Sequence, residues 1–214
     1  MSWSRHPGKR GGGERGYHHG DLREDLVRAA LELIKEKGPA GFTFADAVRW
    51  AGVSPAAPYR HFRDREELLA DVAKRGFALF SDTLQKAWGD GKPSSAEAFK
   101  RVGAAYLNFA RKEPAYYAAM FEAGVNIGAD PELREAAERS FNSLRMAAEI
   151  LVAQMPAKGR PPATMVALHI WSMTHGIASL FARADASRRP LPMKPEELLE
   201  AQTLIYLKGL GLPD

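Results

Sequence analysis

Residues Thr43–Leu68 read TFADAVRWAGVSPAAPYRHFRDREEL, and this stretch decides the fold. Gly52 separates two short helical patterns, at a place where a tight turn needs the left-handed backbone that glycine adopts without steric cost. Ser54 and Pro55 follow as a good N-cap and a good first residue of a second helix. The pattern predicts a helix-turn-helix, in which the second helix enters the major groove of DNA.

The side chains of the predicted second helix, about residues 55–61, fall into two groups. Those near its start would meet base edges, with Ser54 opening the helix beside them: Pro55, Ala56, Ala57 and Arg60. Proline and alanine can contact only thymine methyl groups or groove shape, so Arg60 is the main hydrogen-bonding candidate. The second group is placed for phosphates: Thr43, Tyr59, His61, Arg63 and Arg65. The alternative is an αα-corner in an unrelated helical protein, with Tyr59 and His61 half-buried.

The positive charge of the chain lies with this motif. The whole chain has 30 basic and 26 acidic side chains, a net charge of +4. Residues 1–65 contain 12 of the basic and 8 of the acidic ones, so the remaining residues have 18 of each and are neutral overall. A positive excess confined to one region is the electrostatic pattern expected of a protein that binds phosphates, although +4 is also common in other proteins.

The rest of the chain predicts helices and no strands. Capping boxes or N-cap residues mark several starts: Asp21 with Glu24, Thr43 with Asp46, Asp64 with Glu67, Ser94 with Glu97, and Asp130 before Pro131. The expected helices span about residues 21–37, 43–51, 55–61, 64–87, 94–111, 113–123, 131–155, 163–185 and 195–210. In the first of them one apolar stripe is predicted: Leu22, Leu26, Ala29, Ala30 and Leu33.

These elements predict an all-α protein with a helix-turn-helix domain of three helices and a larger helical bundle. We expect a flexible basic tail at residues 1–20, the DNA-binding domain at 21–65, a linking helix at 66–87 and a regulatory and dimerisation domain at 88–214. The tail carries Arg5, Lys9, Arg10 and Arg15. They would either contact DNA as a basic arm or only keep the protein soluble.

The N-terminal third of the chain strongly resembles the DNA-binding domain of TetR-family transcriptional regulators. The resemblance covers about 60 residues and rests on Phe42-Thr43, Ala51-Gly52-Val53-Ser54, Tyr59-Arg60-His61-Phe62 and Arg65-Glu66-Glu67-Leu68-Leu69. It implies that Thr43, Tyr59, His61 and Arg65 contact the phosphate backbone. The family often has lysine at the position of Arg65, and the positive charge is kept.

A second, shorter resemblance lies in the expected helix 163–185. Trp171, His175 and Gly176 look like the Trp…His-Gly signature of one TetR-family regulatory-domain subgroup. Trp171 and His175 are four residues apart, so they share a helix face and can stack. Gly176 would let a neighbouring helix approach closely. The resemblance also implies a homodimer through the last two helices, where a set of apolar residues suits the interface: Leu198, Leu199, Ile205, Leu207 and Leu210.

Aromatic and methionine side chains gather in the expected regulatory domain. With the Trp-His pair they give a candidate ligand set: Tyr106, Phe109, Tyr117, Met120, Phe121, Phe141, Trp171 and His175. Ligand cavities are mostly apolar with a few polar groups, so the set predicts a small apolar or aromatic effector. Plain core packing is the alternative for each residue taken separately.

Other classes of site find little support. The chain has no cysteine, which excludes disulfides, thiol catalysis and cysteine-based zinc sites, and no His-Glu-x-x-His pattern or Gly-rich phosphate loop is present. We therefore expect no metal, no cofactor and no enzyme activity. The N-terminus lacks the apolar core of a signal peptide. Residues 163–182 carry no charge, but polar residues dilute the run, so a buried helix is favoured over a membrane span.

The sequence thus predicts a cytoplasmic homodimer, most simply a repressor, that binds a double-stranded DNA operator and is released from it by a small-molecule effector. Two alternatives stay open. One is a helical cytoplasmic enzyme, which turnover of a metabolite would reveal. The other is a dimeric DNA-binding protein without a ligand, which effector-sensitive release from DNA would exclude.

Overall fold

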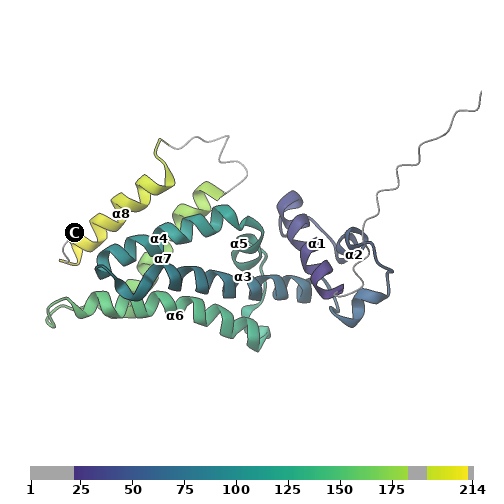
Figure 1. Cartoon of the computed structure of the whole chain (residues 1–214), viewed down its shortest axis with the longest axis horizontal. Coiled ribbons are helices and arrows are strands. Elements are labelled where there is room, and N and C mark those ends of the chain that lie inside the picture. Colours follow the sequence, from purple (N-terminus) through teal and green to yellow (C-terminus); the bar gives the residue numbers. More distant parts are fainter. Residues whose placement is uncertain (1–21, 183–191, 212–214) are drawn as a thin grey trace, which may run out of the picture.

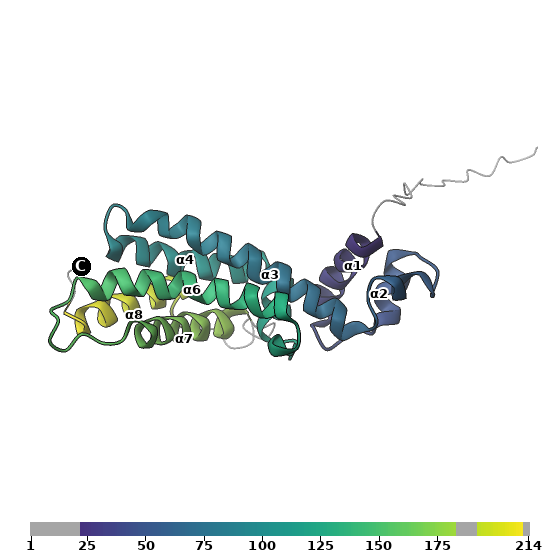
Figure 2. The ribbon, with the colours of Figure 1, turned by 90° about the horizontal axis from the view of Figure 1, so that it is seen from below.

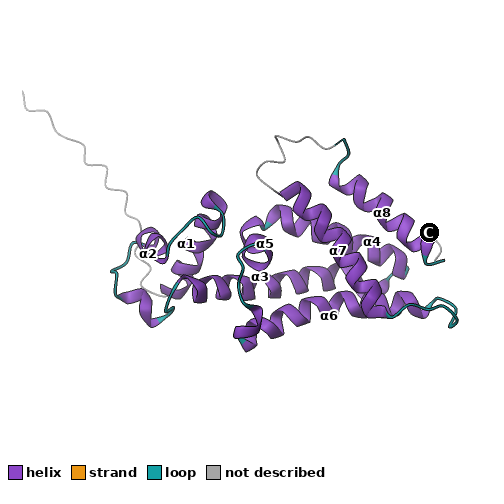
Figure 3. Cartoon of the chain, turned by 180° about the vertical axis from the view of Figure 1, so that it is seen from behind, coloured by secondary structure: helices purple, strands orange, loops and turns teal. Residues whose placement is uncertain are grey.

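The computed structural model describes residues 22–182 and 192–211, and within them every regular element is a helix (Figure 3). The predicted Asp21 cap, the basic tail and the end of the helix expected at 163–185 lie outside the described residues. The elements are α1 Leu22–Lys37, α2 Phe44–Ala51, η1 Ala57–Arg60, α3 Arg65–Trp88, η2 Gly89–Gly91, α4 Ser95–Lys112, α5 Pro114–Phe121, η3 Ile127–Ala129, α6 Pro131–Ala153, α7 Ala163–Ala182 and α8 Pro195–Gly209. The all-α prediction is confirmed.

The molecule is elongated, with α1, α2 and η1 at one end and the bundle α4–α8 at the other (Figure 1). Helix α3 joins them, because its 24 residues run without a break from Arg65, shortly after η1, into the bundle, roughly 36 Å at the α-helical rise. Figure 2 shows α6 and α4 beside α3 along much of the bundle. One continuous helix, α3, therefore runs along the long axis of the protein.

Local signals place the helix starts as predicted. The Thr43 hydroxyl accepts from the backbone N–H of Asp46, and the Asp46 carboxylate accepts from the backbone N–H of Thr43, a complete capping box. Asp64 and Ser94 accept from the N–H groups three residues on. Gly52 ends α2 in the left-handed conformation with φ 70°. Each of these contacts spans at most three residues, which is why the sequence reveals them.

The second helix of the motif differs from the prediction. Instead of an α-helix over 55–61, the chain forms a turn at Pro55-Ala56 and then the short 3₁₀ helix η1, and its N-cap is Ala56 without a side-chain hydrogen bond. The cause is Pro58, which has no N–H to donate and whose ring clashes with an α-helical carbonyl four residues back. The capping role predicted for Ser54 is therefore wrong: its backbone oxygen accepts from Ala57 at 3.2 Å, a three-residue spacing.

Two apolar regions make up the core. One extends from the N-terminal domain along α3, where Leu26, Ala30, Phe62 and Phe77 are buried, and it includes the predicted stripe of α1, whose Leu22 is half-buried. The other joins α4, α6, α7 and α8 around Leu151 and Val166. In the described part of the chain, no helix is both long and apolar enough to span a bilayer.

Candidate nucleic-acid interface and apolar cavity

The predicted DNA-contacting side chains lie on one exposed end of the molecule. Those that are solvent-exposed are Thr43, Ser54, Pro55, Ala56, Tyr59, Arg60, His61 and Arg63. Ala57 and Arg65 are half-buried, and Pro58 is buried and anchors η1 to the domain. We call residues 54–61 the reader segment. Its backbone is held by two prolines, while most of its side chains point to solvent.

Tyr59 is a braced aromatic on this surface. Its side chain is 61% exposed, although an aromatic ring is usually covered in a folded domain. The ring of Phe44, at the start of α2, lies 5.4 Å from it between centroids. This contact ties the reader segment to α2 and fixes the direction in which Tyr59 projects.

The arginines of this end differ in what they contact. The Arg60 guanidinium forms no hydrogen bond or ion pair with the rest of the described chain. Arg63 Nε donates to the Glu67 carboxylate at 3.1 Å yet Arg63 stays 85% exposed, and this hydrogen bond to Glu67 raises the pKa of Arg63. Arg60 is thus the cation of the reader segment that is available to a ligand.

Arg65 is held inward. Its Nη2 donates to the carbonyl oxygen of Pro39, and its guanidinium lies 5.0 Å from the ring centroid of Phe42. The Nε atom is buried with no hydrogen-bond partner among the described residues. Arg65 therefore clamps the start of α3 onto the connection between α1 and α2, a contact between residues 26 apart in the chain.

Thr43 is also engaged locally. Its hydroxyl donates to the Asp46 carboxylate at 2.8 Å and accepts from the Asp46 N–H at 3.2 Å. The bonds from the Thr43 backbone and side chain lower the pKa of Asp46. A phosphate offers only acceptors, so a contact with the Thr43 hydroxyl requires that hydroxyl to turn away from Asp46.

A network of ion pairs joins the N-terminal domain to the bundle. The Asp71 carboxylate of α3 is 5% exposed and lies 2.7 Å from Arg23 Nη2 of α1 and 2.8 Å from Arg75 Nε. Arg75 also binds both Glu24 oxygens at 2.6 Å. Burial by itself would raise the pKa of Asp71, but the hydrogen bond from Arg23 and the charges of Arg75 and Arg23 outweigh it, so the pKa is lowered.

The network reaches Phe62, the residue after the reader segment, and it also reaches α6. The Arg23 guanidinium lies 5.0 Å from the ring centroid of Phe62, which directly follows the reader segment. Lys74 lies 3.6 Å from Asp71 and donates to Glu132, in the first turn of α6, at 2.7 Å. Six charged side chains from α1, α3 and α6 thus form one connected set, which we call the ionic collar: Arg23, Glu24, Asp71, Lys74, Arg75 and Glu132.

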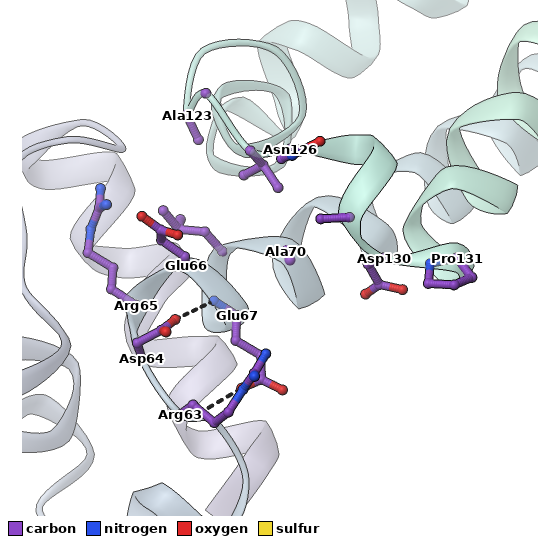
Figure 4. Close-up of a pocket in the computed structure, with 14 residues that line it drawn as sticks. Arg63, Asp64, Arg65, Glu66, Glu67, Ala70, Ala123, Asn126, Asp130 and Pro131 are labelled. Atoms are coloured by element: carbon purple, nitrogen blue, oxygen red, sulfur yellow. Dashed lines mark hydrogen bonds and ion pairs between the residues drawn. The ribbon is translucent and has the colours of Figure 1, made fainter.

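A polar cleft of about 500 Å³ lies between the start of α3 and the connection from α5 to α6 (Figure 4). Charged side chains line its walls, and several are already used in local contacts. Asp64 accepts from Glu67 N–H at 2.9 Å, and Asp130 caps α6. Four carboxylates and two guanidinium groups line the cleft, and the carboxylates of Asp64 and Asp130 are already engaged at helix starts.

A second cavity, of about 340 Å³, is apolar. Its walls come from α3, α5, η3, α6 and α7: Phe77, Phe80, Phe121, Ile127, Ala137, Ser140, Phe141, Leu144, Leu168 and Trp171. Ser140 is its hydroxyl-bearing residue, and that hydroxyl donates to the Ala137 carbonyl oxygen at 2.8 Å. The cavity therefore suits an uncharged apolar molecule, and three of the predicted ligand residues line it, namely Phe121, Phe141 and Trp171.

The other predicted ligand residues are packed behind this wall. Tyr106, Phe109, Tyr117 and Met120 are at most 5% exposed, and the cavity lining does not include them or His175. They sit on faces of α4 and α5 that pack into the core around α3. A sequence pattern cannot tell residues that line the cavity from residues that pack in the core, because both groups are apolar and recur with the spacing of a helix.

His175 forms the polar centre of this packed group. Its Nδ1 lies 2.8 Å from the Tyr106 hydroxyl and 3.2 Å from the Tyr117 hydroxyl. The predicted neighbourhood of Trp171 and His175 is confirmed, with ring centroids 5.6 Å apart. Burial lowers the pKa of His175, which favours the neutral ring. Its Nδ1 is used inside the protein rather than in the cavity.

The residues of α8 that were predicted to form the dimer interface differ in their exposure to solvent. Ile205 is 72% exposed, but Leu199 and Leu207 are buried against this same chain. A Cβ at Gly103 of α4 would lie only 3.2 Å from Leu199, so α8 packs closely on α4. Other apolar side chains are exposed on α7 and α8 instead: Met165, Leu168, Leu180 and Leu204.

Two further sequence expectations concern α7 and metals. No helix of the described chain approaches Gly176, because a Cβ placed there would meet no atom within 4 Å. The close approach expected at Gly176 is therefore absent within this subunit. Among the described residues, no three His, Cys, Asp or Glu side chains are grouped as a metal site would need.

Comparison with known proteins adds the family relationship. Residues 26–72 match a sequence family described as "Bacterial regulatory proteins, tetR family". Residues 99–204 match one described as "Tetracyclin repressor-like, C-terminal domain". Together these matches cover both the end that carries the reader segment and the bundle that carries the apolar cavity.

Individual relatives agree with these matches. The chain is similar to the uncharacterized HTH-type transcriptional regulator YobS of Bacillus subtilis, at 29% identity over 94 residues, which are 44% of this chain and 48% of YobS. The chain thus spans about half the length of that relative. A protein of unknown function from Rhodococcus sp. RHA1 has 29% identity and a TM-score of 0.76, over 92% of this chain and 99% of its own. The TetR-family regulator PfmR from Thermus thermophilus, at 21% identity and a TM-score of 0.66 over 86% and 98%, shares the fold.

Proposed function

Because the chain belongs to the TetR family of transcriptional regulators, we propose that it acts as a homodimeric repressor without enzyme activity, located in the cytoplasm. Each subunit presents one reader segment to one half of a palindromic operator, since a two-fold dimer places the same surface on both half-sites. One observation supports this best: the reader segment is exposed at one end of the same unbroken helix, α3, whose other half lines the apolar cavity.

In this proposal some exposed side chains contact bases and others contact phosphates. Arg60 contacts a base edge, because its guanidinium is exposed and has no partner in the described chain. Tyr59, His61 and Arg63 contact phosphates, which position the protein without reading sequence. Arg65 acts as a positioning residue, since its contacts with Pro39 and Phe42 hold the start of α3 behind the reader segment.

The proposed effector is an uncharged apolar or aromatic molecule that enters the cavity between α3, α6 and α7. Its walls contain no charged side chain, and the hydroxyl of Ser140 is already bonded. An effector that binds the DNA-incompetent arrangement more tightly must weaken DNA binding by the same factor, typically about 5–150-fold for a coupling of roughly 1–3 kcal/mol. A charged effector would lose its hydration in this cavity without a counter-charge.

The test begins with selection of bound DNA from a random duplex pool by the full-length protein. We expect an inverted repeat, with one position whose preference is lost in Arg60→Ala. Arg111→Ala, an exposed arginine of α4, is the matched control and should return the same repeat as the unchanged protein. Recovery of only asymmetric sites would contradict the dimeric reading, and no enrichment at all would contradict DNA binding.

A screen of uncharged aromatic and aliphatic compounds for release from the selected DNA tests the effector. Phe141→Asp places a charge in the cavity wall and should abolish the response while leaving DNA binding intact. Release that depends on charged compounds, or that persists unchanged in Phe141→Asp, would contradict the proposed cavity.

A further inference from the structure

Two neighbouring residues of the reader segment, Pro55 and Ala56, present a surface without hydrogen-bonding side chains. Pro55 and Ala56 are exposed, and neither side chain contains a nitrogen or oxygen atom. Proline also lacks a backbone N–H, so Pro55 offers no donor of any kind. Whatever this surface recognises, its side chains recognise it by apolar contact.

The 3₁₀ geometry brings a third apolar group to this surface. Side chains three residues apart in a 3₁₀ helix lie above one another, because the helix has three residues per turn. Ala56 directly precedes η1 and has helical backbone angles, so Tyr59 lies on its side of the turn. Phe44 holds the Tyr59 ring in place at 5.4 Å between centroids. We call Pro55, Ala56 and the apolar ring carbons of Tyr59 the apolar tip; the Tyr59 hydroxyl is not part of it and serves the phosphate contact proposed above.

Cationic groups border the apolar tip. Arg60 follows Tyr59 directly, Arg63 comes three residues later, and both guanidinium groups are exposed. An apolar patch in a cationic surround fits a ligand that is anionic at its edges and carries small apolar groups between them. Duplex DNA has this chemistry in its major groove, where phosphates flank the bases and the thymine C5-methyl group is the apolar feature of the base edges.

We propose that the apolar tip reads thymine through its C5-methyl group, beside the base contacted by Arg60. This inference rests on the proposed DNA-binding function and adds to it the bases that are recognised. Uracil forms the same base pair as thymine and keeps all its hydrogen-bonding groups, and it lacks only this methyl group. The apolar tip therefore distinguishes the two bases, whereas hydrogen bonding does not.

The experiment replaces thymine by uracil, one position at a time, in synthetic duplexes of the selected DNA site. Burial of one methyl-sized group corresponds to about fourfold in affinity, so a symmetric pair of replacements in the two half-sites should weaken binding about fifteenfold. Replacements outside the half-sites serve as the control and should change nothing. Equal binding of thymine and uracil at every position, by a protein that still binds the selected site, overturns this inference and leaves the proposed function intact.

A protein variant assigns the effect to the apolar tip. Ala56→Gly removes the exposed methyl group from the protein, so the penalty for uracil should shrink at the position that Ala56 contacts. Ala40→Gly, at an exposed alanine outside the reader segment, is the matched control and should keep the full penalty. An uracil penalty of equal size in Ala56→Gly overturns the assignment to the apolar tip. Failure to select any DNA site, in contrast, overturns the proposed function itself.

Discussion

The two halves of helix α3 are held by opposite kinds of interaction. The first half contributes Asp71, Lys74 and Arg75 to the ionic collar, which ties it to α1 and to the start of α6. The second half contributes Phe77 and Phe80 to an aromatic group in the bundle. The Phe80 ring lies 4.9 Å from that of Tyr106 and 5.0 Å from that of Phe109.

This difference separates two kinds of sensitivity in one helix. Ion pairs are directional, weaken with salt and depend on protonation. Aromatic packing depends on volume and hardly responds to either. The junction beside the DNA-binding end should therefore respond to solution conditions, whereas the half that lines the cavity should respond to changes of size and shape. Four experiments test this comparison.

The largest effect is expected at the aromatic half. Phe80 is 2% exposed, and Phe80→Ala removes a buried ring and leaves a cavity beside the existing one. We expect a loss of about 4 kcal/mol in the free energy of unfolding. Urea denaturation at fixed protein concentration measures it. Leu79→Ala, one residue earlier and 41% exposed, is the control and should cost far less. Similar losses for both would contradict the packing described for α3.

The next effect concerns the centre of the ionic collar. Asp71→Ala leaves Arg23 and Arg75 without their shared carboxylate, and we expect a loss of about 3 kcal/mol. The value lies at the low end for a buried pair, because Arg23 and Arg75 keep side-chain exposures of 42% and 29% and can regain water. Asp82→Ala, an exposed acid on the same helix, is the control. If Asp71→Ala lowered the free energy of unfolding less than Asp82→Ala does, Asp71 would not stabilise the junction between the two ends of the molecule.

Acid should weaken the contribution of the first half of α3 to the free energy of unfolding and leave that of the second half unchanged. The pKa of Asp71 is lowered in the folded protein, and the bond from Arg75 lowers that of Glu24. A carboxyl whose pKa is lowered by folding stabilises the folded protein at pH values above its pKa in the unfolded chain, about 4. This contribution is lost as the pH falls through its pKa in the folded protein. The difference in the free energy of unfolding between Asp71→Ala and the unchanged protein, measured by urea denaturation, should stay constant from pH 7 to about 5 and shrink below about 4. The difference for Phe80→Ala should persist over the same range.

The smallest effect is expected at the outer link of the collar. Glu132 is 76% exposed, so its pair with Lys74 at 2.7 Å contributes about 0.5 kcal/mol at most. Glu132→Gln should lower the midpoint of thermal unfolding slightly in dilute buffer and not at all in about 1 M salt. Glu138→Gln, an exposed acid further along α6, is the control. A loss in Glu132→Gln that persists in high salt would mean that the link acts by packing.

Sequence alone predicts the parts of this molecule that depend on near neighbours. The Thr43–Asp46 box, the Gly52 turn and the apolar stripe of α1 involve residues one to four positions apart, and all three are confirmed. The reader segment is the exception among local features. There, Pro58 overrides the α-helical pattern that the flanking residues favour, because it cannot donate the hydrogen bond of an α-helical turn.

Long-range partners explain most of the remaining differences. Asp71 follows Leu68 at a spacing that places it on the buried side of α3, but its partner Arg23 lies 48 residues away. Leu199 and Leu207 are apolar on a short helix, and no local pattern tells whether such a face meets its own chain or another. For the same reason the sequence grouped eight ligand candidates, although only three of them line the cavity.

The two prolines of the reader segment also bear on how such a protein can change. Pro55 and Pro58 fix the backbone by ring geometry, and the buried side chains of Pro58 and Phe62 anchor it to the domain. The exposed side chains at positions 56 and 60 therefore contribute little to folding. Substitutions there can accumulate one by one without a stability threshold to cross, so this surface can diverge, or be redesigned, while the fold is conserved.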